Sequence, residues 1–165
     1  ERHIAEPDQA ASDLALPAAR EALEQAGVEP EELDLIIVAT ATPDMLFPAT
    51  AALVADALGA RKAAAYDLLA GCTGFVYALS QAYGQVATGL SSRALVIGSE
   101  VLSKITNWQD RSTCILFGDG AGAAVVRPVE AGGIAGIELE FREGAEESAV
   151  FARAGARQQV TQPRL

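Results

Sequence analysis

The sequence contains few residues of several chemically important types, and each scarcity excludes a class of function. Its 165 residues include two cysteines, Cys72 and Cys114, and one histidine, His3. The cysteines show neither the spacing of a metal site nor a framework of disulfide pairs. We therefore expect no bound metal and a reducing, cytoplasmic environment.

Basic residues are also scarce. The 12 Lys and Arg residues are outnumbered by 22 Asp and Glu residues, which gives a formal net charge of −10. Nucleic acids and anionic membranes bind clustered positive charge, so we expect neither as a partner. No apolar run approaches the roughly 18 residues of a membrane span. The charged opening ERHIAEPD does not have the pattern of a signal peptide.

What the chain does contain is a high share of hydrophobic residues, 50%, which is sufficient for the core of one domain over residues 1–165. Hydrophobic patterning predicts a series of alternating helices and strands. The predicted helices cover 7–27, 49–59 and 73–89, and the predicted strands cover 33–40, 63–67, 93–100, 122–129 and 132–143. This alternation predicts an α/β layered domain with a mixed, mostly parallel sheet, in which the last two strands are antiparallel neighbours.

Local signals refine two of these helices. Gly27 is a typical residue to end the first helix, and Asp8 or Ser12 is a candidate to cap its start. Pro17 lies inside the same pattern and predicts a kink or a restart. The helix over 73–89 is apolar nearly all round, so we expect it to be buried.

Cys72 stands in the stretch YDLLAGCTGF, between a predicted strand and a predicted helix. A thiol at the N-terminus of a helix is stabilised as the thiolate, and the free N–H groups of the first turn can bind an oxyanion. Gly71 and Gly74 allow a sharp turn and a close approach of substrate. The pattern is compatible with a nucleophile and equally with a small buried thiol. His3 is far away in sequence, so no Cys–His pair is evident.

The sequence allows more than one interpretation of three loops. Trp108 and Arg111 can sandwich a flat ring, or can simply belong to a surface loop. The apolar segment 45–47, between two prolines, can be a pocket lid, an interface plug or a core anchor. The glycines in FGDGAGAAVV, 117–126, do not match a dinucleotide-binding pattern and precede a strand.

Four stretches together resemble β-ketoacyl-ACP synthase III, a condensing enzyme of the thiolase superfamily. They are AYDLLAGCTGFVYAL, ALVIGSEVLSKI, DRSTCILFGDGAGAAVV and the opening ERHIAEPDQAASDLA. The resemblance implies a thiolase-like layered αβα fold. It also implies an acyltransferase that initiates fatty acid synthesis in the cytoplasm, as a homodimer, by decarboxylative Claisen condensation of acyl-CoA with malonyl-ACP. Acyl-CoA and acyl carrier protein are then its partners, and no cofactor is implied.

The resemblance also implies roles for individual residues. Cys72 corresponds to the nucleophile that carries the acyl group, with its own N–H in the oxyanion hole. Arg111 corresponds to the arginine that stacks on the CoA adenine, and Phe47 to the aromatic residue that closes the acyl pocket across the dimer interface. Leu102 and Phe117 correspond to walls of that pocket.

The sequence also departs from the family pattern. The family's chain is about twice as long, and its catalytic His and Asn lie in His-Gln-Ala-Asn and Gly-Asn-Thr stretches that do not occur here. We therefore expect residues 1–165 to form part of the N-terminal domain, without its first strand and without the C-terminal half. Such a piece is expected to be inactive alone, with apolar faces such as 35–38 left open. A polyketide starter ketosynthase and a non-catalytic thiolase-like partner or remnant remain as alternatives.

Overall fold

The computed structural model describes residues 2–134, 136, 137 and 139. The chain divides into two compact units, residues 1–128 and 129–165. The described residues of the second unit form no helix or strand, and half of the strand predicted over 132–143 lies outside the described residues. Among the residues that are described, no helix has the length and apolarity needed to cross a membrane.

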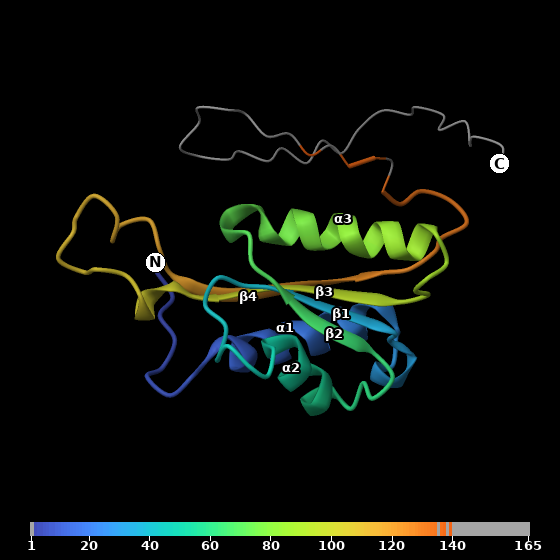
Figure 1. The fold of residues 1–165 in the computed structure, drawn as a ribbon, viewed down its shortest axis with the longest axis horizontal. Helices are drawn as coiled ribbons and strands as arrows, with labels where there is room; N and C mark the ends of the chain where they lie inside the picture. Colours follow the sequence, from blue (N-terminus) through green and yellow to red (C-terminus); the bar gives the residue numbers. More distant parts are fainter. Residues whose placement is uncertain (1, 135, 138, 140–165) are drawn as a thin grey trace. The chain divides into compact units, whose positions relative to one another are not determined.

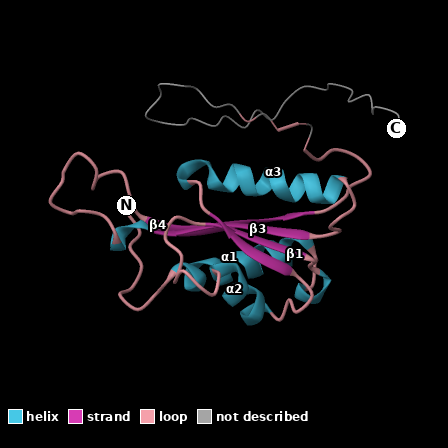
Figure 2. Cartoon of the chain, viewed as in Figure 1, coloured by secondary structure: helices cyan, strands magenta, loops and turns pink. Residues whose placement is uncertain are grey.

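The first unit is organised around one sheet of four strands (Figures 1 and 2). The strands are β1 (Leu35–Ala39), β2 (Ala64–Leu68), β3 (Ala94–Val101) and β4 (Asp119–Val126), in the spatial order β2-β1-β3-β4. β1 pairs in parallel with both β2 and β3, whereas β4 pairs with β3 in the antiparallel direction. The predicted mixed, mostly parallel sheet is therefore confirmed.

Helices cover both faces of this sheet (Figure 1). α3 (Gly74–Ala87) lies on one face, and α1 (Ala11–Ala26) and α2 (Thr50–Leu58) lie on the other. Short 3₁₀ turns complete the unit, namely η1 (Pro30–Glu32), η2 (Gly71–Thr73) and η3 (Leu102–Lys104). This is the αβα layering that the sequence predicts.

β1 is the central strand of the core. Its residues alternate between two apolar clusters: Ile36 and Val38 face α1 and α2, and Leu35, Ile37 and Ala39 face α3. All five are buried. The expectation that residues 35–38 lie open is therefore wrong, because β2 and β3 flank β1 and helices cover both of its faces.

The start of α1 differs from the prediction. Its N-cap residue is Ala10, which has no capping side chain, so neither Asp8 nor Ser12 caps the helix. Carboxylates supply the contacts instead: Asp13 accepts the N–H of Ala10 at 2.8 Å, and Asp44 accepts the N–H of Ser12 at 2.9 Å. The helix continues through Pro17 without a restart and ends, as predicted, at Gly27.

The start of α2 is also capped by a carboxylate from a residue outside the helix. Asp67, on β2, accepts the N–H of Thr50 at 2.8 Å and the N–H of Ala51 at 2.7 Å. Two of the four N–H groups that a helix start leaves unpaired are thereby satisfied by the neighbouring strand. The contact fixes the end of the loop that joins β1 to α2.

α3 is buried on one face only. Gly74, Ala78 and Ala82 are its buried residues, and their spacing of four residues places them on the side that packs on the sheet. The prediction of an entirely buried helix is therefore wrong for the unit formed by residues 1–128. The small side chains allow the helix to lie close to the strands.

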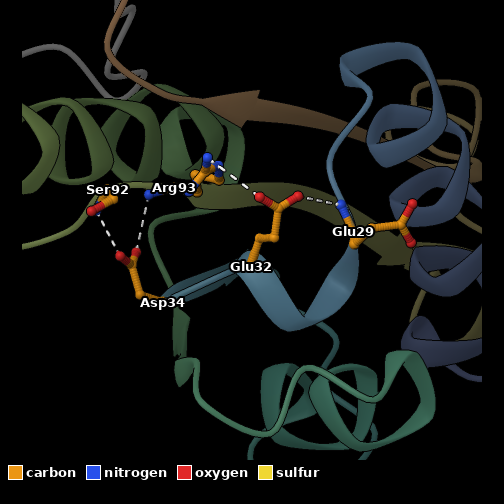
Figure 3. A network of polar contacts seen from close by, with 5 residues as sticks. All are labelled: Glu29, Glu32, Asp34, Ser92 and Arg93. Atoms are coloured by element: carbon orange, nitrogen blue, oxygen red, sulfur yellow. Dashed lines mark hydrogen bonds and ion pairs between the residues drawn. The ribbon is translucent and has the colours of Figure 1, made fainter.

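The edge of the sheet where β1 and β3 begin is held by a network of polar contacts (Figure 3). The carboxylate of Asp34 accepts the N–H of Ser92 at 2.6 Å and that of Arg93 at 3.2 Å. Glu32 accepts the N–H of Glu29 at 3.0 Å and pairs with the guanidinium of Arg93 at 3.3 Å. These contacts connect the chain before β1 to the chain before β3.

Candidate active site

A cavity lies at the opposite edge of the sheet. The carboxyl ends of β1, β2 and β3 meet there, and the antiparallel β4 begins there. Loops leaving parallel strands at this edge are the usual location of binding sites in open α/β sheets. The cavity has a volume of about 370 Å³. Its lining consists of Ala39, Ala41, Gly71, Cys72, Phe75, Gly98, Ser99, Glu100, Leu102, Phe117 and Gly120.

Cys72 lines this cavity in the turn η2, directly before α3. Its side chain is exposed, so the interpretation of Cys72 as a small buried thiol is wrong. The preceding Gly71 has φ +55°, a left-handed conformation that residues with a Cβ adopt at a cost. The glycine therefore allows the sharp turn that presents the thiol to the cavity.

Close backbone packing forms the base of the site. A Cβ on Gly98 would lie 3.3 Å from the ring of Phe75, and a Cβ on Gly74 would lie 3.3 Å from Cβ of Ala39. Both distances are shorter than ordinary carbon contacts. Glycine at these two positions therefore allows the first turn of α3 to approach β1 and β3, which brings η2 over the ends of the strands.

Glu100 connects two of the loops around the cavity. Its carboxylate accepts the N–H of Ala41 at 2.8 Å and the hydroxyl of Thr42 at 2.7 Å. The Thr42 oxygen in turn accepts the N–H of Val101 at 2.9 Å. The end of β3 therefore fixes the chain that leaves β1.

Asp119 connects three further segments. Its carboxylate accepts the N–H of Ala5, the N–H of Ser103 and the hydroxyl of Ser103. Desolvation by burial raises the pKa of Asp119. The hydrogen bonds from Ser103 and Ala5 and the charge of Lys104 outweigh that effect and hold the pKa below its ordinary value.

The N-terminal segment lies along this side of the site. The backbone N–H of Asp119 donates to the carbonyl of His3 at 3.0 Å, and the ammonium of Lys104 donates to the carbonyl of Pro7 at 3.0 Å. The guanidinium of Arg2 lies over the ring of Trp108, 5.6 Å from its centroid. Trp108 therefore contacts the cation of Arg2, and the possible sandwich of a flat ring between Trp108 and Arg111 stays a prediction.

Arg111 is exposed in a loop that Asp110 organises. The Asp110 carboxylate accepts the hydroxyl of Ser112 at 2.6 Å, its N–H at 2.9 Å, and the hydroxyl of Thr113 at 2.8 Å. These bonds, led by the Ser112 hydroxyl, lower the pKa of Asp110. Cys114 in the same loop is half-buried, and its neighbours Ile115 and Leu116 are exposed.

The structure brings together three of the five site residues predicted from the sequence. Cys72, Leu102 and Phe117 line the same cavity. Cys72 lies in the connection between β2 and α3, and Leu102 and Phe117 lie at the two ends of the connection between β3 and β4. Phe47 lies outside it, 87% exposed in the loop between β1 and α2, and Arg111 does not line it either. Their predicted roles remain predictions.

Sequence reasoning missed Phe75, Glu100 and Asp119 as parts of the site. Glu100 is the last acidic residue of a strand that ends at the cavity, and this position was a usable signal. Asp119 lies within the glycine-rich stretch 117–126, which the sequence predicts to be a tight loop that brings backbone near the active site, with no role for its carboxylate. Its contacts involve residues more than 100 positions away, and the sequence gives no indication of that pairing.

The layered fold and the exposed cysteine at the strand ends define a thiolase-like protein. The chain matches the family of 3-oxoacyl-[acyl-carrier-protein (ACP)] synthase III over residues 66–142. It is 62% identical, over 140 residues, to a β-ketoacyl-[acyl-carrier-protein] synthase III of Desulfitobacterium hafniense, an alignment covering 84% of this chain and 42% of that protein.

Solved structures give the same result. The 3-oxoacyl-[acyl-carrier-protein] synthase III of Aquifex aeolicus superposes with a TM-score of 0.77 at 50% identity, over 79% of this chain and 42% of that one. The priming β-ketosynthase of the R1128 polyketide pathway gives 0.78 at 44% identity, over 84% and 42%. The chain belongs to the 3-oxoacyl-ACP synthase III family and spans about two fifths of the length of these relatives.

Proposed function

We propose that the full-length protein containing this chain is a β-ketoacyl-ACP synthase III, which condenses an acyl-CoA with malonyl-ACP to begin fatty acid synthesis. The observation that carries the proposal is the exposed thiol of Cys72, which faces a cavity of about 370 Å³ at the start of α3. The similarity to enzymes of that name over 84% of the chain supports it.

In the first step, Sγ of Cys72 attacks the thioester carbonyl of the acyl-CoA. A C–S bond to Cys72 forms, the C–S bond to CoA breaks, and the CoA thiolate leaves and takes up a proton. The start of α3 carries a partial positive charge, which stabilises an anion at this position. The N–H of Cys72 is proposed to donate to the oxyanion of the tetrahedral intermediate.

In the second step, malonyl-ACP loses CO₂, and the resulting carbanion attacks the acyl carbonyl. A C–C bond forms, and the Cys72 thiolate leaves as 3-oxoacyl-ACP is released. The family's His and Asn, which are implied to stabilise this step, belong to the proposed second half. The present chain is proposed to be part of the N-terminal domain that supplies the nucleophile.

The remaining predicted residues are proposed to bind the substrate. Leu102 and Phe117 line the cavity with Cys72 and form walls for the acyl group. Arg111, exposed on the loop that Asp110 holds, stacks on the CoA adenine. Phe47, also exposed, closes the acyl pocket of a second copy in a cytoplasmic homodimer. Acyl-CoA and acyl carrier protein are the proposed partners, and the reaction needs no cofactor.

The test uses the full-length protein, acetyl-CoA and malonyl-ACP. Peptide mass spectrometry after incubation with acetyl-CoA should find the acetyl group on Cys72, and adding malonyl-ACP should release it as 3-oxobutyryl-ACP. Cys72→Ala should abolish both, whereas Cys114→Ala should retain both. An acetyl group on another residue, or product formation by Cys72→Ala, would overturn the proposal.

The same experiment separates the alternatives. A non-catalytic thiolase-like protein would show no acylation of Cys72. A polyketide starter ketosynthase, like the R1128 priming enzyme to which the chain is also similar, would acylate Cys72 but transfer the group to a polyketide carrier protein in preference to the fatty acid carrier. A competition between the two carrier proteins decides between these pathways.

A further inference from the structure

Asp119 is a charged group at the site for which the proposed function gives no role. It does not itself line the cavity. It lies in sequence between Phe117 and Gly120, which do, and its carboxylate binds Ser103, the neighbour of Leu102. Any effect of Asp119 on the cavity therefore acts through the residues that it holds.

The carboxylate of Asp119 lies where the pairing between β3 and β4 ends. The β3–β4 ladder closes with the pair Val101 and Asp119. Beyond this pair β3 continues into η3, and the chain before β4 is the loop that contains Phe117. Main-chain pairing between the two strands stops here, so another contact must hold the two segments together.

Asp119 provides that contact with three accepted hydrogen bonds. The N–H of Ser103 donates to Oδ1 at 2.8 Å, and the hydroxyl of Ser103 donates to Oδ2. The N–H of Ala5 donates to Oδ2 at 2.8 Å, which adds the N-terminal segment. Bonds to an ionised carboxylate are stronger than neutral ones, and Ser103 is buried, so water does not readily replace them.

We propose that Asp119 is a positioning residue that fixes Leu102 against Phe117 and thereby sets the acyl-chain length that the cavity accepts. The proposal rests on the proposed function, because it assumes that these two side chains contact the acyl group. It assigns no chemical step to Asp119. Loosening the wall should weaken the discrimination between short and long acyl groups, because each methylene in a fitted apolar pocket contributes to selectivity.

The chain offers a matched control at the other edge of the sheet. Asp34 also accepts two backbone N–H groups, those of Ser92 and Arg93, and also joins segments next to β3 (Figure 3). It lines no part of the cavity. Replacing Asp34 by Asn therefore removes a similar connection without touching the proposed acyl wall.

The experiment compares D119N with D34N in the full-length protein. Asparagine has nearly the same shape, but its NH₂ group faces N–H donors and cannot accept from them. We measure kcat/KM for acetyl-CoA and for octanoyl-CoA. D119N should change the ratio of the two values in favour of octanoyl-CoA by roughly fivefold or more, and D34N should leave it within about twofold.

Ser103→Ala provides a second variant, which removes only the hydroxyl donor. It should shift the ratio in the same direction but by less than D119N does, and the S103A/D119N double variant should shift it less than the two separate effects combined. If D119N does not fold, the ratio in S103A decides: a shift supports the proposal and an unchanged ratio overturns it.

The outcomes distinguish this inference from the proposed function. If Cys72 of the wild type is acetylated but D119N and S103A keep the wild-type ratio, the positioning role is wrong and the proposed function stands. If D34N shifts the ratio as much as D119N does, the effect is general loosening and the positioning role is again wrong. If Cys72 is not acetylated at all, the proposed function itself fails.

Discussion

The conformation of Gly71 leads to a test of how the turn presents Cys72. Gly71 and Gly89 both have positive φ, +55° and +76°, and a Cβ at either position would meet no heavy atom within 4 Å. They lie on the two sides of α3, one before its start and one after its end. Alanine at either position therefore introduces backbone strain and no steric clash.

The two alanine variants should lose similar stability. A residue with a Cβ in the left-handed region costs about 1 to 2 kcal/mol, so Gly71→Ala and Gly89→Ala should lower the free energy of unfolding by comparable amounts. Their effects on Cys72 should differ. The chain relieves strain at residue 71 by moving the adjacent thiol, and a displacement of about 1 Å can slow a reaction about a hundredfold.

The assay uses peptide mass spectrometry of the full-length protein on two separate samples, one labelled briefly with iodoacetamide and the other incubated with acetyl-CoA without alkylation. Cys114 is the internal reference in the iodoacetamide sample. In Gly71→Ala the acetylation rate of Cys72 should fall by about tenfold or more, and in Gly89→Ala it should stay within about twofold. Equal rates in the two variants would show that the geometry of this turn does not set the reactivity of the thiol.

Four further outcomes follow from the structure. Cys72, which is exposed, should react with iodoacetamide faster than the half-buried Cys114, and equal labelling would contradict the site. Asp67→Ala should lower stability by about 1 to 2 kcal/mol, because α2 loses both accepted N–H bonds; chemical denaturation measures this change. Phe47→Ala should alter the acyl-chain preference of the full-length protein, because Phe47 is 87% exposed within this chain and is proposed to close the pocket of a second copy; the ratio of kcat/KM for acetyl-CoA and octanoyl-CoA measures this change. The pKa of Asp119 is lowered from its ordinary 3.8 in the folded protein, so its ionised form stabilises the fold above that pH. This contribution is lost as the pH falls through the lowered pKa. D119N should therefore reduce the pH dependence of the free energy of unfolding in the acid range, as measured by chemical denaturation at a series of pH values.

Much of the fold was predictable because its strands are strongly patterned. β1 is a continuous apolar run and β3 begins with one, and such runs indicate strands covered on both faces. The bounds of β1 fall within the predicted range, and β3 ends one residue beyond its predicted range. The N-terminus of α1 was predicted wrongly because its polar contacts are not local. The carboxylate of Asp44, 32 residues away, binds Ser12, and no short-range capping rule detects such a partner.

The candidate site was predictable only in part, for a related reason. Cys72 could be identified from the turn that surrounds it, since the glycines on both sides are adjacent in sequence. Leu102 and Phe117 came from resemblance alone, and the cavity that contains all three was visible only in the structure. Asp119 escaped notice because its bonds depend on the register between β3 and β4 and on the path of the N-terminal segment.

The position of the cavity follows from the order of the strands more than from any single motif. β1 lies between β2 and β3, and the chain leaves β1 toward α2 on one face but leaves β2 toward α3 on the other (Figure 1). Loops from two adjacent strands therefore diverge at their carboxyl ends, and this divergence opens a crevice. Cys72 is in the loop that turns toward α3, so the helix start with its partial positive charge and the crevice that is proposed to admit a substrate arise from the same crossover. A nucleophile placed after β1 would instead face the start of α2, where Asp67 already accepts the first N–H groups, and those groups would not be free to stabilise an anion.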